Sequence, residues 1–138
     1  MFYRTFALVF VSFIAAVAPG ASIQRDRPDL FPVRLPGVVN TVGFCRRDAS
    51  GKLVVTVRNQ NNNDVGAHAS ITRVEFNRGG SFELPTPAIP DNSSVDLQPL
   101  AIPQACWSPD CAFTITVDSH NQVHESNEGN NTVAGKCL

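Results

Sequence analysis

Residues 118–131, with the sequence DSHNQVHESNEGNN, form the segment that is richest in side chains able to do chemistry. Carboxylate and amide oxygens are the ligands that calcium takes in proteins, usually six to eight at a time. A calcium ion is therefore the one cofactor that the sequence suggests. The candidate ligands are Asp118, Glu125, Glu128 and Asn130.

The same segment has a second interpretation, as a structural turn. Asn and Asp side chains bond to nearby backbone groups and tolerate left-handed conformations, so runs of them also build rigid turns. The spacing does not fit the helix-loop-helix calcium motif, which needs a Gly at its sixth position and a Glu at its twelfth. His120 and His124 would share a face only in a helix, so we expect no transition-metal site. The turn is the favoured interpretation, and calcium stays open.

The four cysteines, Cys45, Cys106, Cys111 and Cys137, supply the other chemistry. An even number in an exported domain predicts two disulfides, for which three pairings are possible. Cys106 and Cys111 flank a tight loop whose proline favours a turn, which leaves Cys45 to pair with Cys137. Closing that long loop should stabilise the fold by ~4 kcal/mol. A zinc site is disfavoured, because only one cysteine pair is close in sequence.

The start of the chain has the pattern of a secretory signal peptide. Arg4 gives a positive beginning, residues 5–18 are almost entirely apolar, and Gly20 and Ala21 supply small residues for cleavage. The apolar run is short for a permanent membrane helix. We predict a signal peptide over residues 1–21 and one domain over residues 22–138, with its core from about residue 28. The expected location is secreted or periplasmic, with no membrane span after cleavage and no lipid anchor.

Composition and motifs argue against two classes of function. The net charge is -1 and the 11 Lys+Arg are scattered, whereas a nucleic-acid partner needs a basic stripe. The sequence contains no nucleophile elbow, no phosphate-binding glycine loop and no helical pair of zinc-binding histidines. We therefore expect neither nucleic-acid binding nor enzyme activity.

The elements that must position these residues are β-strands. Apolar and polar residues alternate with a period of two, and Gly, Pro, Asn and Asp interrupt the alternation at short intervals. Residues 82–90 hold three prolines and predict an edge strand or a crossover, because proline cannot donate to a strand ladder. The pattern predicts an all-β antiparallel sandwich. The expected strands include residues 53–58, 72–76, 95–98, 112–118 and a last one with Val133 and Cys137, and the largest core candidates are Phe44, Phe76, Trp107 and Phe113.

Four pieces of the sequence occur in a fixed order: Pro28-Asp29-Leu30, LVVTVRN with its amide-rich loop at 53–67, the Pro-containing lead into a Ser-Val-x-Leu strand at 84–97, and FTITVDSHNQVHESNEGNNT at 113–132. Together they resemble one known family, the cell-adhesion-related domain found in bacteria (CARDB). The last piece is the most specific, and the resemblance extends from Pro28 to the end of the chain. It implies an immunoglobulin-like or fibronectin-III-like sandwich of about seven strands, and a role in adhesion. The chain differs from repeated family modules in holding one copy and paired cysteines, which suggests a free-standing version.

Three hypotheses for function follow. The leading one is an exported, non-catalytic binding or adhesion module that contacts a protein or a cell-surface polysaccharide through its sheet face or loops. Its expected contact surface comprises the Asn59–Asp64 and Asp118–Asn131 loops, because recognition is usually built on loops of a rigid scaffold. The alternatives are a calcium-stabilised structural protein and a secreted hydrolase inhibitor that presents the constrained Cys106–Cys111 loop. The sequence leaves the partner and the oligomeric state open.

Overall fold

The computed structural model describes residues 26–60 and 64–138. The predicted signal peptide therefore lies outside the described residues, as do residues 61–63 of the first predicted contact loop. No helix in the described ranges is long and apolar enough to cross a membrane. These ranges contain the strands β1 (Leu30–Pro32), β2 (Thr56–Asn59), β3 (Ser70–Phe76), β4 (Gly80–Thr86), β5 (Ser93–Asp96), β6 (Cys111–Thr116) and β7 (Thr132–Cys137), and the short 3-10 helices η1 (Thr41–Phe44), η2 (Gln104–Cys106) and η3 (Glu128–Asn130).

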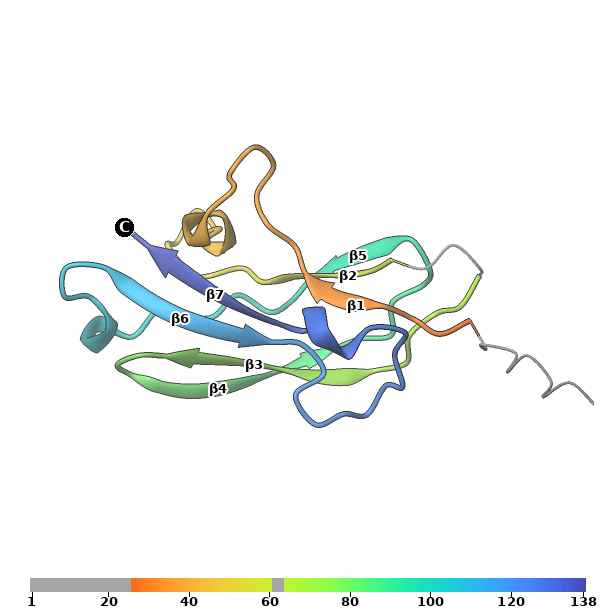
Figure 1. The fold of residues 1–138 in the computed structure, drawn as a ribbon. Coiled ribbons are helices and arrows are strands. Elements are labelled where there is room, and N and C mark those ends of the chain that lie inside the picture. Colours follow the sequence, from red (N-terminus) through yellow and green to blue (C-terminus); the bar gives the residue numbers. More distant parts are fainter. Residues whose placement is uncertain (1–25, 61–63) are drawn as a thin grey trace, which may run out of the picture.

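The strands form two antiparallel sheets that pack face to face (Figure 1). One sheet has the order β1-β2-β5 and the other the order β4-β3-β6-β7. The described part of the chain thus has seven strands in a sandwich, which confirms the fold class predicted from the sequence. Sheets of this kind keep one face on the core and one face in water.

Period-two alternation decides which residues fill the space between the sheets. In β3 the side chains of Thr72, Val74 and Phe76 are buried, whereas Arg73 and Glu75 are exposed. β6 follows the same rule, because successive side chains of a strand point to opposite faces. The most deeply buried apolar side chains are Leu30, Leu53, Val55, Val57, Val74, Ile89, Phe113, Ile115 and Val117.

The prolines of residues 82–90 lie where the sequence predicted them. β4 is an edge strand of the four-stranded sheet, and Pro85 sits in it opposite Ile71 of β3. Proline is tolerated there because its missing N–H can face away from the ladder.

Two expectations, about the strand at residues 53–58 and about the loop that follows it, need correction. The strand predicted over residues 53–58 is regular only in β2, and Leu53 instead forms isolated bridges with Arg47 and Leu100. The sequence predicts a loop from Asn59 onward, but Asn59 belongs to β2 and is 0% exposed.

Of the four large core candidates, Phe76 and Phe113 are buried, whereas Phe44 and Trp107 are half-buried at the margin of the core.

Two disulfides join short helices to the four-stranded sheet: Cys45–Cys137 joins the end of η1 to β7, and Cys106–Cys111 joins η2 to the start of β6. This is the pairing that the sequence favoured. Cys111 and Cys137 lie directly opposite each other in β6 and β7, and neither side chain is exposed. Both bridges therefore meet at one place, where η1 and η2 are fastened to neighbouring strands.

Candidate functional site

The segment that follows β6 begins with a turn built on Asp118. The Asp118 carboxylate accepts the backbone N–H of Gln122 at 2.9 Å and the backbone N–H of Val123 at 2.8 Å. Asp118 and Asn121 have positive φ values of 46° and 50°, a region that Asp and Asn tolerate better than most residues. At Asp118, therefore, the carboxylate does what the turn interpretation expected.

A second network of hydrogen bonds surrounds the carboxylate of Glu125, a residue that is 3% exposed. Glu125 Oε2 accepts the backbone N–H of Leu30 at 2.6 Å, and Oε1 accepts the amide of Asn131 at 2.9 Å. The Asn131 amide also donates to Glu128 Oε2 at 3.2 Å, and Glu128 Oε1 accepts the backbone N–H of Glu125 at 3.0 Å. One amide thus bridges two carboxylates.

This environment changes the acidity of Glu125. Burial raises its pKa to about 7, and the nearby carboxylates of Glu128 and Asp118 push the pKa in the same direction. The hydrogen bonds from Leu30 and Asn131 favour the ionised form and offset part of the rise.

Asp29 connects this segment to the end of β2. Its backbone N–H donates to Asn59 Oδ1 at 3.1 Å, and its carboxylate accepts the amide of Asn130 at 2.8 Å. The backbone N–H of Gln60 donates to the Asp29 carbonyl at 2.8 Å. The start of the first predicted contact loop, at Asn59 and Gln60, therefore lies close to the end of the second, at Asn130, and Asp29 bonds to both. No sequence pattern indicated this role, because Asp29 stood out only as part of the opening strand.

The outer side of the 118–131 segment is polar. Its exposed residues carry imidazole, amide, hydroxyl and carboxylate groups, while the buried residues Asp118, Val123, Glu125 and Asn131 hold the backbone in place. We call the exposed set the loop surface; it consists of His120, Asn121, Gln122, His124, Ser126, Asn127 and Glu128.

The four predicted calcium ligands do not come together as one set. Asp118 is engaged by two backbone N–H groups and Asn130 by Asp29, whereas Glu125 and Glu128 meet at Asn131. Residues 26–60 and 64–138 contain no group of three or more His, Cys, Asp or Glu side chains placed to hold a metal ion. The calcium prediction stays a prediction. Asn131, whose amide donates to both glutamates, was not among the residues singled out from the sequence.

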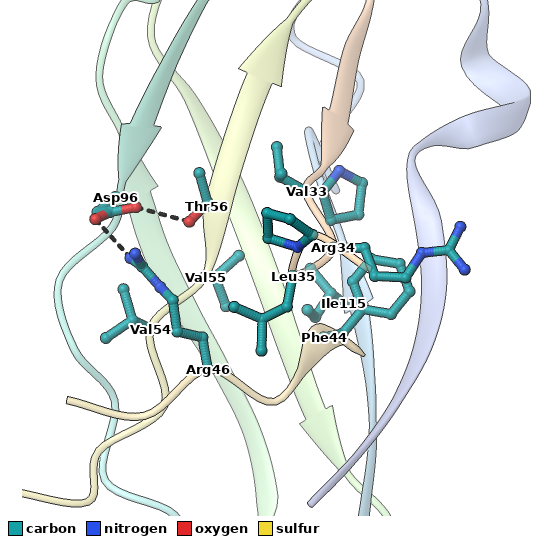
Figure 2. A pocket seen from close by; sticks show the side chains of 12 residues that line it. Val33, Arg34, Leu35, Phe44, Arg46, Val54, Val55, Thr56, Asp96 and Ile115 are labelled. Atoms are coloured by element: carbon teal, nitrogen blue, oxygen red, sulfur yellow. Dashed lines mark hydrogen bonds and ion pairs between the residues drawn. The ribbon is translucent and has the colours of Figure 1, made fainter. Parts of the chain in front are cut away.

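A small pocket opens between the segment after β1 and the segment that leads into β2 (Figure 2). Its volume is about 180 Å³, and apolar side chains such as Leu35, Phe44 and Ile115 line it. Arg46 Nη2 lies 2.5 Å from Asp96 Oδ2 at its rim, and the Thr56 hydroxyl donates to Asp96 Oδ1 at 2.7 Å. These two partners lower the pKa of Asp96. A cavity of ~150 Å³ holds one benzene ring, so this pocket has room for one small apolar group.

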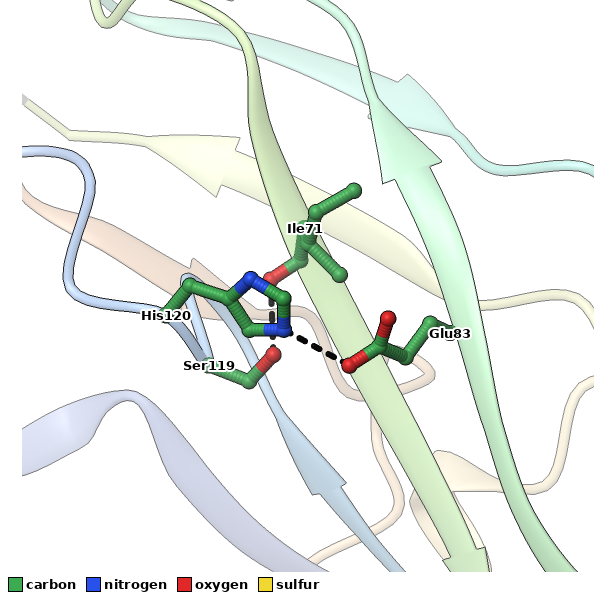
Figure 3. Close-up of polar contacts among 4 residues, drawn as sticks. All are labelled: Ile71, Glu83, Ser119 and His120. Atoms are coloured by element: carbon green, nitrogen blue, oxygen red, sulfur yellow. Dashed lines mark hydrogen bonds and ion pairs between the residues drawn. The ribbon is translucent and has the colours of Figure 1, made fainter.

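His120 and Ser119 are the neighbours that most resemble catalytic partners (Figure 3). His120 Nε2 lies 2.6 Å from Glu83 Oε1 on β4, and both side chains are about half exposed. The Ser119 hydroxyl, however, donates to the Ile71 carbonyl at 3.2 Å. A serine nucleophile needs its hydroxyl on the base, so this arrangement fastens the loop to the sheet rather than activating Ser119.

The Cys106–Cys111 loop projects at the other end of β6. Trp107 is half-buried, and the Arg47 guanidinium lies 5.9 Å from the centre of its ring. Lys136 of β7 holds Asp110 with a 2.7 Å ion pair. Ser108 and Pro109 are left exposed at the tip.

Comparisons with known proteins agree with this architecture. The CARDB family model matches residues 27–135. The chain is also similar to the solution NMR structure of a domain of a "putative cell surface protein" from Methanosarcina acetivorans. The TM-score is 0.59 at 20% identity, over 80% of this chain and 90% of that chain, which shows a shared fold. No curated protein matches the chain.

Proposed function

The chain belongs to the CARDB family, and from this premise we propose that it is an exported, non-catalytic module that binds a protein or a polysaccharide at a cell surface. The loop surface is the part of the molecule to which we assign this binding. The observation that carries the assignment is the two sets of buried hydrogen bonds, at Asp118 and at Glu125, which hold an exposed polar loop in one conformation.

Rigidity favours recognition, because a loop that is already ordered loses little conformational entropy when a partner binds. The buried bonds of Asp118 and Glu125 run to backbone N–H groups, so they fix the path of the chain itself. Asp29 adds the end of β2 to the same unit. The loop surface is therefore presented by a scaffold, as in other sandwich domains that bind through their loops.

The chemistry of the loop surface suits a polar partner. Amide and imidazole groups such as those of Gln122, His124 and Asn127 both donate and accept hydrogen bonds. Such groups match the hydroxyls of a surface polysaccharide or the polar face of a protein. They do not provide the positive charge that a polyphosphate requires.

Two further observations support export and the absence of catalysis. Disulfides persist in oxidising compartments, and the described cysteines form two of them. Ser119 gives its hydroxyl to a backbone carbonyl instead of to His120, which leaves no activated nucleophile at this pair.

A retention experiment tests the proposal. The oxidised mature chain is immobilised, and exported proteins and surface glycans are passed over it. A Gln122→Ala/His124→Ala variant should lose the retained partner. The matched control, Asn77→Ala/Arg78→Ala, removes two exposed polar side chains from the β3–β4 turn and should retain it. Equal retention by both variants would place the contact elsewhere, and a parent chain that retains nothing would overturn the binding role.

The Cys106–Cys111 loop favours a second candidate function, a hydrolase inhibitor. Its disulfide and the Lys136–Asp110 ion pair hold an exposed Ser-Pro tip, and a pre-ordered tip is what a bait loop requires. An inhibition assay against secreted proteases and glycosidases tests this candidate. If the oxidised chain slows none of them at micromolar concentration, the inhibitor role is excluded.

A further inference from the structure

A larger pocket lies between β1 and β7, the edge strands of the two sheets at one margin of the sandwich (Figure 1). It has a volume of about 450 Å³ and is open to solvent. Ligand pockets in proteins usually have ~300–1,000 Å³ and combine apolar walls with a few polar groups. We call it the margin pocket; its lining includes the apolar Phe31 and Val133 and the polar Asp29, Arg34, Gln60 and Asn130.

Phe31 differs from the other aromatic side chains of the domain. Its neighbours in β1, Leu30 and Pro32, are buried, whereas Phe31 is half-buried and points away from the core, because successive side chains of a strand face opposite ways. Within residues 26–60 and 64–138, every other aromatic side chain belongs to the core or packs against it, and Phe31 does neither. The margin pocket therefore contains an aromatic surface that the fold itself does not use.

Two charged side chains flank this ring along the chain. Asp29 directly precedes β1, and its carboxylate accepts the amide of Asn130 at 2.8 Å. Arg34 lies beyond the other end of β1, where its guanidinium donates to the Val39 carbonyl at 2.7 Å and lies 5.6 Å from the centre of the Phe44 ring. A carboxylate has further acceptor positions and a guanidinium has further N–H donors, so both groups can bond a ligand as well.

The polar groups of the margin pocket suit a neutral ligand. One carboxylate and one guanidinium balance in charge, and the exposed amide of Gln60 adds a donor and an acceptor without charge. These planar groups can bond pairs of neighbouring hydroxyls. A sugar residue offers the complementary chemistry, because it has C–H groups on the faces of its ring and hydroxyls around its edge.

We propose that the margin pocket binds a short stretch of a neutral polysaccharide, with Phe31 packed against a sugar ring and with Asp29 and Arg34 bonded to hydroxyls. The Cα atoms of Asp29 and Arg34 are separated by roughly 16 Å if the segment is extended at ~3.3 Å per residue. That span is longer than one sugar ring, so the two charged groups contact different sugar residues of the same chain.

This inference rests on the proposed function in one respect, because it selects the polysaccharide from the two classes of partner given there. Its location is different, since no residue of the margin pocket belongs to the loop surface. The pocket nevertheless adjoins the loop ends, because Asp29 bonds both Asn130 and Gln60. A glycan held in the pocket therefore continues toward the loop surface.

The test uses the oxidised mature chain with soluble oligosaccharides as probes. Linear oligomers of glucose, mannose, galactose and N-acetylglucosamine are titrated, with oligogalacturonate as the acidic comparison, and the ring resonances of Phe31 are followed by ¹H–¹³C NMR. At least one neutral oligomer should shift these resonances in a saturable way, with a Kd of about 1 mM. Oligogalacturonate should bind more weakly, because the Asp29 carboxylate repels its charges.

Three variants make the test specific, with affinities measured by calorimetric titration. Phe31→Ala should weaken binding at least tenfold, whereas Phe31→Trp keeps an aromatic ring and should retain it. Arg34→Gln should also weaken binding, and its matched control, Arg73→Gln, removes the same charge from the exposed face of β3 and should leave the affinity unchanged. Circular dichroism verifies that each variant is folded, as expected for a ring outside the core.

Four results would overturn the site. The first is no shift of the Phe31 resonances by any neutral oligomer up to about 10 mM, well above the expected Kd. The second is equal weakening by Arg34→Gln and Arg73→Gln. The third is stronger binding of oligogalacturonate than of every neutral oligomer. The fourth is glycan binding that Phe31→Ala keeps and Gln122→Ala/His124→Ala loses, which moves the contact to the loop surface.

The proposed function can survive the failure of this site. A parent chain that retains an exported protein but binds no glycan would remove the margin pocket as a sugar site and leave the binding role in place. A parent chain that retains nothing in the retention experiment, yet binds an oligosaccharide through Phe31, would have the opposite meaning.

Discussion

The carboxylate of Glu125 accepts the backbone N–H of Leu30 at 2.6 Å, although the two residues are 95 positions apart in sequence. β1 has only three residues paired with β2, and this bond adds to the backbone bonds that flank the strand, from the Val33 N–H to Thr56 and from the Gln60 N–H to Asp29. The same carboxylate reaches Asn131 through its other oxygen. One side chain therefore contributes both to the attachment of the first strand and to the order of the 118–131 segment.

Glu125 should make the stability of the domain depend on pH. Its pKa is about 7 in the folded chain, against 4.5 for an unperturbed glutamate, so the folded state binds more protons between these values. The free energy of unfolding should then fall as pH rises from about 4.5 to about 7, by at most ~3 kcal/mol, and level off above. Urea unfolding across this range measures the slope. Glu125→Gln should flatten it, and an unchanged slope would show that Glu125 does not control the pH dependence.

Asp118→Ala should destabilise the domain through the backbone. Removing the carboxylate leaves the N–H groups of Gln122 and Val123 without their acceptor, and a buried unsatisfied donor costs ~1–3 kcal/mol. Asp118→Asn keeps one acceptor oxygen and tolerates the positive φ of 46°, so it should lose less. Urea unfolding of both variants checks the order. If alanine costs no more than asparagine, the turn does not depend on these bonds.

Gly135 of β7 should not accept a larger side chain. It lies opposite Phe113 in β6, and a Cβ at this position would come within 2.2 Å of the Phe113 ring. Gly135→Ala should therefore cost ~1–3 kcal/mol, because the buried ring must move. Ala134→Val, on the exposed face of the same strand, should change stability by less than ~0.5 kcal/mol. Thermal unfolding monitored by circular dichroism compares the two, and equal effects would contradict this packing argument.

The two disulfides should differ in their contribution to stability. Cys45–Cys137 closes a loop with a sequence separation of 92, and Cys106–Cys111 one with a separation of 5. Loop-closure entropy predicts losses of ~4.7 and ~2 kcal/mol when the bridges are replaced by paired serines. Denaturant unfolding of the two double variants measures the difference. Equal losses would show that loop length does not control the effect here.

The sequence predicted most of the fold, because the information for it is local. β3 and β6 follow from period-two alternation, and the edge position of β4 follows from Pro85. The disulfide pairing followed from the short spacing of Cys106 and Cys111. Each of these inferences needed only residues close together in the chain.

The candidate site was harder to predict, because its bonds join distant segments. Asp118 and Glu125 are both acidic residues in one polar run, yet one builds a local turn and the other bonds β1. Asn130 meets Asp29 across 101 positions. Asn59 is a turn residue by type but is buried, because the carbonyls of Val65 and Ile89 accept its amide and its own oxygen accepts Asp29 N–H.

The Cys45–Cys137 bridge has a mechanical consequence. Cys137 is the penultimate residue, and the first described residues and the C-terminus lie at opposite ends of the domain (Figure 1). Tension applied at the two ends of the chain would pass from Cys45 through the disulfide to Cys137, so strands β2 to β7 would lie in a covalent loop that carries no load. Only the stretch before Cys45, with β1 and η1, could be drawn out. A chain held at its two ends would therefore extend by a short, fixed length and keep most of its sandwich folded.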